Sequence, residues 1–262
     1  MTSSPYASSA DLAGAGVVVT GATSGLGAAT ARLFAARGAH VVVCGRNESR
    51  GTTLAAEIGG VFARVDVRDE ESMRAAMALG SLAPRGLRVA VSAAGSAIVE
   101  KTLGRNGTHS RASFTEQLET NLVGSFTLLT EAAATMAQNE AESDGSRGVI
   151  ALTSSVAAYE GQMGQLAYAA AKGGVNAMVL PAARDLARHG IRVLGVAPGV
   201  FDTPFMDVLS DEAKSGIGAT VPFPQRLGHA DEFAQLVHSL VTNPMLNGEV
   251  VRIDGALRLG MR

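Results

Sequence analysis

A tyrosine and a lysine four residues apart could form an acid–base pair in this chain. Tyr168 and Lys172 lie in the stretch LAYAAAKGG, and Ser155 precedes the tyrosine by thirteen residues. On a helix this spacing places the tyrosine and lysine side chains on one face, one turn apart. A free phenol has a pKa near ~10, but a nearby ammonium favours the phenolate, and a serine hydroxyl could hold a carbonyl oxygen beside it. The same spacing also occurs on ordinary helix surfaces, so a redox function requires a cofactor site elsewhere in the chain.

A glycine-rich turn near the N-terminus is a candidate for that site. The apolar run Val17–Val19 leads into Thr20–Gly27, which reads TGATSGLG, and then into the helical pattern ATARLFAARG. A strand, a glycine turn and a helix start in this order expose backbone amides that suit a pyrophosphate. Tight strand-to-helix turns also use glycine for steric reasons alone.

Composition excludes several classes of function. The chain has 262 residues, 47% of them hydrophobic, with a net charge of −2 and a mean hydropathy of +0.19. It has no basic footprint for nucleic acid and no apolar run near the roughly 20 residues that span a bilayer. Its single cysteine, Cys44, lies in an apolar run, and its five histidines lack ligand spacing, so we expect no metal site. We expect residues 1–15 to be a flexible leader, residues 16–262 to be one domain, and the protein to be cytoplasmic.

Strand-like and helix-like patterns alternate along the chain. The expected strands are Val17–Val19, His40–Cys44, Val61–Val65, Leu87–Val91, Gly148–Ser154, Ile191–Ala197 and Glu249–Ile253. After the helix that opens at the glycine turn, the expected helices are Glu48–Ile58, Glu70–Leu79, Phe114–Gln138, Gln165–Arg188 and Ala230–Val241. This alternation predicts an α/β fold with a doubly wound parallel sheet of seven strands and helices on both faces.

Two connections are longer than such units need. Residues 96–113 form a polar insertion, and Pro198–Gly228 is an irregular, proline-punctuated segment whose residues 200–227 we expect to cover the substrate as a mobile lid. Ligands bind at the carboxyl ends of the strands in such sheets. The glycine turn, Asp66, Gly95, Ser155 and Pro198 all fall at those ends, so the candidate motifs should converge on one edge.

Taken together, these motifs resemble the short-chain dehydrogenase/reductase family in order and spacing, over essentially the whole chain. The motifs are Thr20–Gly27, Ser92–Gly95, Asn121, Ser155, Tyr168, Lys172 and Pro198-Gly199. The segments APGVFDTPF, VPFPQRLG and NPMLNGEVVRIDGALR, with the 96–113 insertion, resemble the branch that acts on 3-hydroxyacyl-CoA thioesters and hydroxysteroids. The resemblance implies a Rossmann-like fold, a nicotinamide cofactor and a homotetramer.

The resemblance also implies roles for four catalytic residues. Tyr168 would exchange a proton with the substrate oxygen, and Ser155 would hold that oxygen. Lys172 would lower the pKa of Tyr168 and bind the nicotinamide ribose. Asn121 would steady a water that links Lys172 to solvent, although a local helix–helix hydrogen bond is the alternative for an amide in an apolar stretch.

The implied cofactor contacts come from the strand ends. They are Gly21, Thr23, Ser24, Gly25, Leu26, Gly27, Arg46, Asp66, Val67, Ala93, Gly95, Tyr168, Lys172, Pro198, Phe201 and Thr203. Asp66 and Val67 would hold the adenine, although a polar cap at the strand end is the rival interpretation of Asp66.

The chain departs from NAD-using relatives at the end of the second strand. Such relatives carry an acid there for the adenosine ribose, whereas this chain has Gly45 followed by Arg46. The missing acid removes repulsion of a 2′-phosphate, and the guanidinium supplies donors for it. We therefore expect NADP(H) to be favoured, with NAD(H) possible; the alternative is that Arg46 is a surface arginine.

The sequence thus predicts an NAD(P)-dependent oxidoreductase that interconverts a secondary alcohol and a ketone. The expected substrate is a 3-hydroxyacyl-CoA or another bulky apolar alcohol such as a hydroxysteroid, with no nucleic acid or membrane partner. The alternatives are a catalytically inactive dinucleotide-binding sensor or scaffold, and a competent enzyme whose main role is structural within a larger complex.

Overall fold

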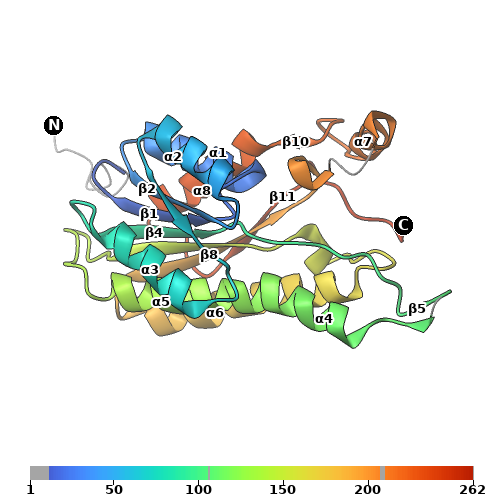
Figure 1. The fold of residues 1–262 in the computed structure, drawn as a ribbon, viewed down its shortest axis with the longest axis horizontal. Coiled ribbons are helices and arrows are strands. Elements are labelled where there is room, and N and C mark those ends of the chain that lie inside the picture. The colour runs from blue at the N-terminus through green and yellow to red at the C-terminus, as the bar shows by residue number, and fades with distance from the viewer. Residues whose placement is uncertain (1–11, 106, 207–209, 262) are drawn as a thin grey trace.

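A seven-stranded sheet with helices on both faces forms the body of the protein (Figure 1). The computed structural model describes residues 12–105, 107–206 and 210–261. The sheet order is β11-β8-β7-β4-β1-β2-β3, and every pairing in it is parallel. Its strands are β1 (Gly16–Thr20), β2 (His40–Gly45), β3 (Val61–Arg64), β4 (Leu87–Ser92), β7 (Gly148–Thr153), β8 (Ile191–Pro198) and β11 (Val250–Ile253).

The helices form a layer on each side of the sheet. One layer holds α1 (Gly25–Ala36), α2 (Glu48–Ile58) and α8 (Ala230–Thr242), and the other holds α3 (Glu70–Ser81), α4 (Arg111–Leu118), α5 (Gly124–Met136) and α6 (Leu166–Ala187) (Figure 1). Alternate residues of β1 face opposite layers: Val17 and Val19 join the core under α1, and Val18 joins the core under α3. The expected doubly wound sheet is confirmed.

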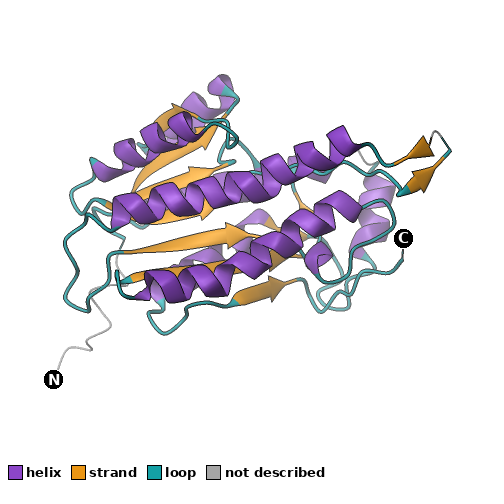
Figure 2. Ribbon diagram, turned by 90° about the horizontal axis from the view of Figure 1, so that it is seen from below, coloured by secondary structure: helices purple, strands orange, loops and turns teal. Residues whose placement is uncertain are grey.

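All strands of the sheet point toward one edge of the molecule. In Figure 2 the strand arrows run toward the C-terminus and toward a small hairpin formed by β5 (Leu103–Gly104) and β6 (Gly107–Thr108). The described N-terminal residues lie at the opposite, amino edge. This geometry brings the loops that follow β1, β2, β4, β7 and β8 to one side of the protein.

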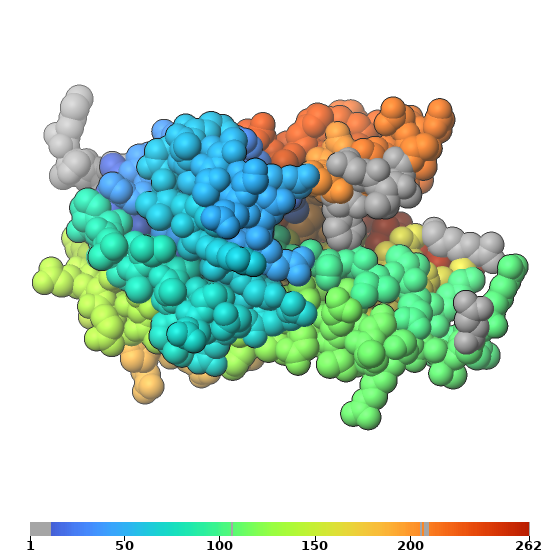
Figure 3. Space-filling model, viewed as in Figure 1, coloured from blue at the N-terminus to red at the C-terminus, as the bar shows by residue number. Residues whose placement is uncertain are grey.

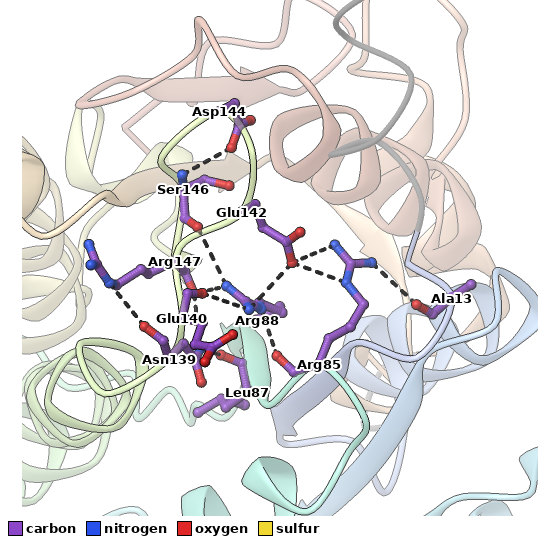
Figure 4. A network of polar contacts seen from close by, with 10 residues as sticks. All are labelled: Ala13, Arg85, Leu87, Arg88, Asn139, Glu140, Glu142, Asp144, Ser146 and Arg147. Carbon is purple, nitrogen blue, oxygen red and sulfur yellow. Dashed lines mark hydrogen bonds and ion pairs between the residues drawn. The ribbon is translucent and has the colours of Figure 1, made fainter.

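Arginines bind backbone carbonyls at the amino edge, and Figure 4 shows those that Arg88 and Arg147 contact in the loop after α5. Arg88 donates to the carbonyl of Glu140 and Arg147 to that of Asn139, just after α5, while Arg192 donates to the carbonyls of Leu240 and Val241 at the end of α8. Cations near a helix C-terminus complement its partial negative charge. Burial lowers the pKa of Arg192 to about 10. This polar network therefore anchors the edge remote from the candidate site.

Three expectations from the sequence differ from the structure. The expected Phe114–Gln138 helix begins at Arg111, because Ser110 caps it, and it contains a π turn at Glu119–Val123 between α4 and α5. The irregular 198–228 segment contains β9 (Phe201–Asp202), a 3₁₀ turn at Pro204–Met206, the helix α7 (Asp211–Gly218) and β10 (Gly228–His229). Finally, Leu12 and Ala15 of the expected 1–15 leader are buried, whereas residues 1–11 lie outside the described part.

The described helices include none that is both long and apolar enough to cross a membrane.

Candidate active site

Tyr168, Lys172 and Ser155 converge as their spacing predicts. Tyr168 and Lys172 lie one turn apart near the start of α6, and the Lys172 Nζ is 5.7 Å from the centre of the Tyr168 ring. Ser155 follows β7 and caps a short 3₁₀ turn, where its hydroxyl accepts from the backbone N–H of Ala157 at 3.1 Å. The end of β7 and the start of α6 thus bring a phenol, an ammonium and a hydroxyl close together.

Burial dominates the electrostatics of this group. It raises the pKa of Tyr168, and the hydrogen bond with Ser155 opposes that rise. It lowers the pKa of Lys172 to about 8 from its ordinary 10.5. Desolvation is the largest effect on the phenol and the Ser155 bond is the one that opposes it, so the expected lowering of the phenol pKa by Lys172 stays a prediction.

Lys172 is held in place by two bonds to the end of β7. Its Nζ, in a side chain only 3% exposed, donates to the carbonyl of Thr153 at 2.9 Å, and its own carbonyl accepts from the Ser154 hydroxyl at 3.0 Å. The Ser154 hydroxyl therefore fixes the helix turn that carries the lysine.

Asn121 lies in the π turn and binds the loop after β4. Its Oδ1 accepts from the N–H of Ser96 at 3.2 Å, and its Nδ2 donates to the carbonyl of Ser96 at 2.9 Å. A Cβ placed on Gly95 would lie 2.8 Å from Asn121 Oδ1 and 3.6 Å from Lys172 Nζ. The side chain of Asn121 therefore positions the 95–96 turn beside Lys172, and the expected role of this residue in steadying a water stays a prediction.

The glycine turn and the start of α1 fit a pyrophosphate. Gly21 has a φ of 66°, and a Cβ on it would lie 2.6 Å from the Ala93 carbonyl oxygen, so the turn lies against the loop after β4. Ser24 is the N-cap of α1 but makes no side-chain cap bond, and no acid lies in the first turn. A Cβ on Gly27 would lie 2.5 Å from the Gly21 carbonyl oxygen, which explains the close packing of the helix on the turn. These amides could hold an anion.

The end of β2 has no room for a side chain beside Thr23. A Cβ on Gly45 would lie 2.6 Å from Thr23 Cγ2 and 3.2 Å from its Oγ1. Arg46 is exposed and makes no hydrogen bond or ion pair with the residues that the structure describes, although its charge helps to lower the pKa of Asp66.

The Asp66 carboxylate is bound by Arg68. The Arg68 side chain donates to both of its carboxylate oxygens, at 3.0 and 2.7 Å, and is the largest cause that lowers its pKa to about 2. The Arg68 N–H also donates to Oδ1 at 3.1 Å, which forms the strand-end cap given above as the rival interpretation. A carboxylate accepts about four hydrogen bonds, so an adenine contact stays a prediction. Val67 packs against Gly124: a Cβ placed on Gly124 would lie 2.7 Å from Val67 Cγ2.

The segment after β8 reaches back to the glycine turn. A Cβ on Gly25 would lie 3.3 Å from Thr203 Cβ, so Thr203 and the Leu26 turn share one side of the site. Pro198 ends β8 in a buried position, whereas the Phe201 ring is 7% exposed and packs edge-on against Phe233. Because the Phe201 side chain belongs to the core, only its backbone is available to a cofactor.

The insertion is anchored beside the start of α6. Glu100 N–H donates to the Gly164 carbonyl at 2.9 Å, and its carboxylate accepts from the Ser110 N–H at 2.7 Å. His109 Nδ1 lies 3.0 Å from the Glu100 carbonyl oxygen. In Figure 3 the surface is hollowed where the orange segment after β8 overhangs the green helices of the other layer.

Comparisons with known proteins agree with this geometry. Residues 15–214 match the family model for short chain dehydrogenase. This chain belongs to the short-chain dehydrogenase family. It is 45% identical to human 3-hydroxyacyl-CoA dehydrogenase type-2 and 44% identical to the Drosophila melanogaster protein of that name, each over 92% of this chain and 94% and 96% of the relative. A crystal structure of 3-hydroxyacyl-CoA dehydrogenase type-2 from Mycobacterium avium superposes with a TM-score of 0.92 at 41% identity, covering 95% of this chain and 98% of the other.

Membership of the family establishes the general reaction. The chain is a dehydrogenase that interconverts an alcohol and a ketone with a nicotinamide dinucleotide cofactor. In the described part of the chain, no three His, Cys, Asp or Glu side chains gather as a metal site would require. Sequence reasoning missed Ser96 and Gln117, which contact Asn121 but form no motif of their own.

Proposed function

We propose that this dehydrogenase acts on a bulky apolar secondary alcohol, a 3-hydroxyacyl-CoA thioester or a hydroxysteroid, and prefers NADP(H). The observation that carries the reaction is the grouping of Tyr168 and Ser155, both partly buried, with the buried Lys172 at the carboxyl end of β7. The names of the relatives at 44–45% identity support the substrate class.

In oxidation, the alcohol proton passes to the Tyr168 phenolate, while the Ser155 hydroxyl holds the same oxygen. A nicotinamide held at the strand ends would supply the acceptor for the hydride of the alcohol carbon, and in reduction the Tyr168 phenol would return the proton to the substrate oxygen. The ammonium of Lys172 stabilises the phenolate, and the bonds from Lys172 to Thr153 and Ser154 keep it in position. Asn121 holds the 95–96 turn against Lys172.

The cofactor would lie along the strand ends. The backbone amides of the Gly21–Gly27 turn would hold its pyrophosphate, together with Ser24, whose side chain makes no cap bond of its own. Ala93 and Gly95 would line the cofactor channel. Residues Pro198, Phe201 and Thr203 would contact the nicotinamide end. Arg46 supports the preference for NADP(H), because it is exposed and its guanidinium forms no hydrogen bond or ion pair within the described part of the chain. Asp66 and Val67 would contact the adenine.

The insertion and the segment after β8 would form the substrate walls. The Glu100 N–H of the insertion donates to the Gly164 carbonyl just before α6, the helix that carries Tyr168, and this bond supports a role of the hairpin as a wall at the mouth of the site. We propose that residues 200–227 act as the lid over an apolar substrate.

We propose a homotetramer in the cytoplasm as the working form. Exposed apolar side chains on α5, on α6 and at the end of the π turn before α5 support the assembly: Val123 is 38% exposed, Phe126 51%, Leu166 49% and Leu180 44%. Large apolar side chains left in contact with water are typical of an interaction surface where they lie together. The alternative of an inactive binding module finds no support, because all four expected catalytic side chains are present and brought together.

A substrate and cofactor screen tests this proposal. Acetoacetyl-CoA, a ketosteroid and a small apolar ketone are each reduced with NADPH and with NADH, and kcat/KM is measured for the six pairs. We expect acetoacetyl-CoA or the ketosteroid with NADPH to give the highest value, at least tenfold above the same substrate with NADH. A highest value for the small ketone would refute the substrate class, and a preference for NADH would refute the cofactor choice.

A further inference from the structure

A row of polar side chains continues from the catalytic site along α4 and α5. Gln117, Asn121 and Ser125 recur every four residues on one buried helix face, and Ser92 and Ser96 face them from β4 and its loop. The Ser92 and Ser125 hydroxyl oxygens are 3.0 Å apart, and the Ser125 hydroxyl donates to the Asn121 carbonyl at 2.8 Å. Gln117 is the outermost member of this row.

Gln117 binds the side-chain hydroxyl of Ser96, which is the one polar group of that residue that Asn121 does not bind. Asn121 binds the backbone N–H and carbonyl of Ser96, while Gln117 Nε2 donates to the Ser96 hydroxyl at 3.2 Å. The carbonyl of Gln117 also accepts from Asn121 Nδ2 at 3.0 Å. Two side chains one turn apart therefore clamp Ser96 at three atoms.

The clamped turn lies against Lys172. Gly95 precedes Ser96, and a Cβ placed on it would lie within 3.6 Å of both Asn121 Oδ1 and Lys172 Nζ. A shift of the 95–96 turn by about the reach of a methyl group would therefore bring it against the Asn121 amide and the Lys172 ammonium. Holding Ser96 in place keeps these surroundings of the ammonium constant.

Stability alone does not explain a glutamine at this position. Its side chain is fully buried, and its Oε1 has no hydrogen-bond partner among the described residues. Whichever way the amide is turned, the Ser96 hydroxyl pairs with only one of its two polar atoms. A buried polar atom left unpaired costs free energy that a leucine of similar volume would avoid.

We propose that Gln117 is a positioning residue of the active site, which fixes Ser96 and, through the 95–96 turn, the place of Lys172. It acts through Ser96 and touches neither substrate nor cofactor. This inference rests on the proposed acid–base role of Tyr168 and Lys172.

The test compares Gln117→Leu, Ser96→Ala and the double variant with the wild-type protein. We expect kcat to fall about tenfold in each single variant, and the double variant to lose no more, because both changes remove the same bond. The melting temperature of Gln117→Leu should equal or exceed that of the wild type. The rise of its oxidation rate with pH should shift to higher pH, because a displaced ammonium stabilises the phenolate less. Thr115→Leu, an exposed change on the same helix, is the control and should change none of these quantities.

Three results would overturn the proposal: a kcat of Gln117→Leu within twofold of the wild type, losses that multiply in the double variant, or an unshifted pH profile with a lowered melting temperature. The last would show that Gln117 is only structural. Any alcohol that the wild-type protein oxidises serves as substrate, so the result does not depend on the natural substrate. Failure of the acid–base assignment itself is recognised separately, by a Tyr168→Phe variant that retains wild-type turnover.

Discussion

At the scale of single residues, the site combines a partly buried phenol with a fully buried lysine, whose charge is costly to bury. Burial lowers the pKa of Lys172 to about 8, while the bonds to Thr153 and Ser154 keep the side chain beside Tyr168. A lysine poised near neutral pH responds to small changes in its surroundings. Stability is therefore given up at Lys172 in favour of catalysis.

This cost predicts a pH-dependent stability difference between the wild type and Lys172→Met. Between pH 8 and 10.5 the unfolded chain holds the lysine proton more fully than the folded protein, so the free energy of unfolding rises with pH. The Lys172→Met variant has no ammonium at this position, so its free energy of unfolding lacks this rise with pH. The wild-type value minus the variant value should therefore increase by about 2 kcal/mol from pH 7.5 to 9.5, measured by urea unfolding. Parallel pH curves for the two proteins would show that Lys172 titrates normally.

The end of β2 predicts how cofactor choice can be changed. The double change Gly45→Asp with Arg46→Leu supplies a ribose acceptor and removes the phosphate donor, which on its own would favour NADH. However, a Cβ at position 45 would lie only 2.6 Å from the Thr23 methyl carbon, so the aspartate does not fit without a shift. We therefore expect this double change to bind both cofactors weakly, and added Thr23→Ser, which removes the methyl, to restore NADH binding.

Thr23→Val is the matched control, since it keeps a methyl at the crowded position and should not restore binding. Dissociation constants for NADH and NADPH, from fluorescence titration, decide the matter. Equal recovery with serine and valine would mean that the Thr23 methyl does not restrict position 45.

At the scale of elements, the sequence predicted the regular units best where local signals agreed. The helix Glu48–Ile58 has the predicted bounds, because Asn47 caps its start and Gly59 ends it in a left-handed conformation. The helix α7 was missed, although Ser210 followed by Asp211 and Glu212 is a recognisable start. The π turn around Asn121 has no sequence signal. The contacts of Gln117 and Ser96 arise only when segments about twenty residues apart pack together.

The insertion gives a prediction at this scale. The N–H of His109 donates to the Thr102 carbonyl at 3.0 Å, so residues 103–108 can be replaced by two glycines without disturbing Glu100 or the Ser110 cap. We expect this trimmed variant to raise KM for acetoacetyl-CoA about tenfold and to leave KM for a small ketone nearly unchanged. Equal effects on both substrates would show that the hairpin is no part of the substrate wall.

At the scale of the whole molecule, the exposed apolar faces of α5 and α6 predict self-association. Phe126→Glu places a charge in the centre of this surface, and we expect it to convert a tetramer into smaller species in light scattering after gel filtration. Leu82→Glu is the control, because Leu82 is 80% exposed at the amino edge and its change should leave the assembly intact. A wild-type monomer, or a tetrameric Phe126→Glu variant, would rule out assembly through these helices.

The central claim is that the Tyr168 phenol exchanges the proton of the reacting alcohol. Tyr168→Phe removes only the phenol oxygen, so the packing of α6 and the cofactor contacts of Lys172 should persist. Its turnover, measured at cofactor saturation beside the dissociation constant of the cofactor, tests the claim most directly. We predict that turnover falls roughly 10²–10⁴-fold while the dissociation constant changes less than about twofold. Turnover close to that of the wild type would show that the proton comes from another group.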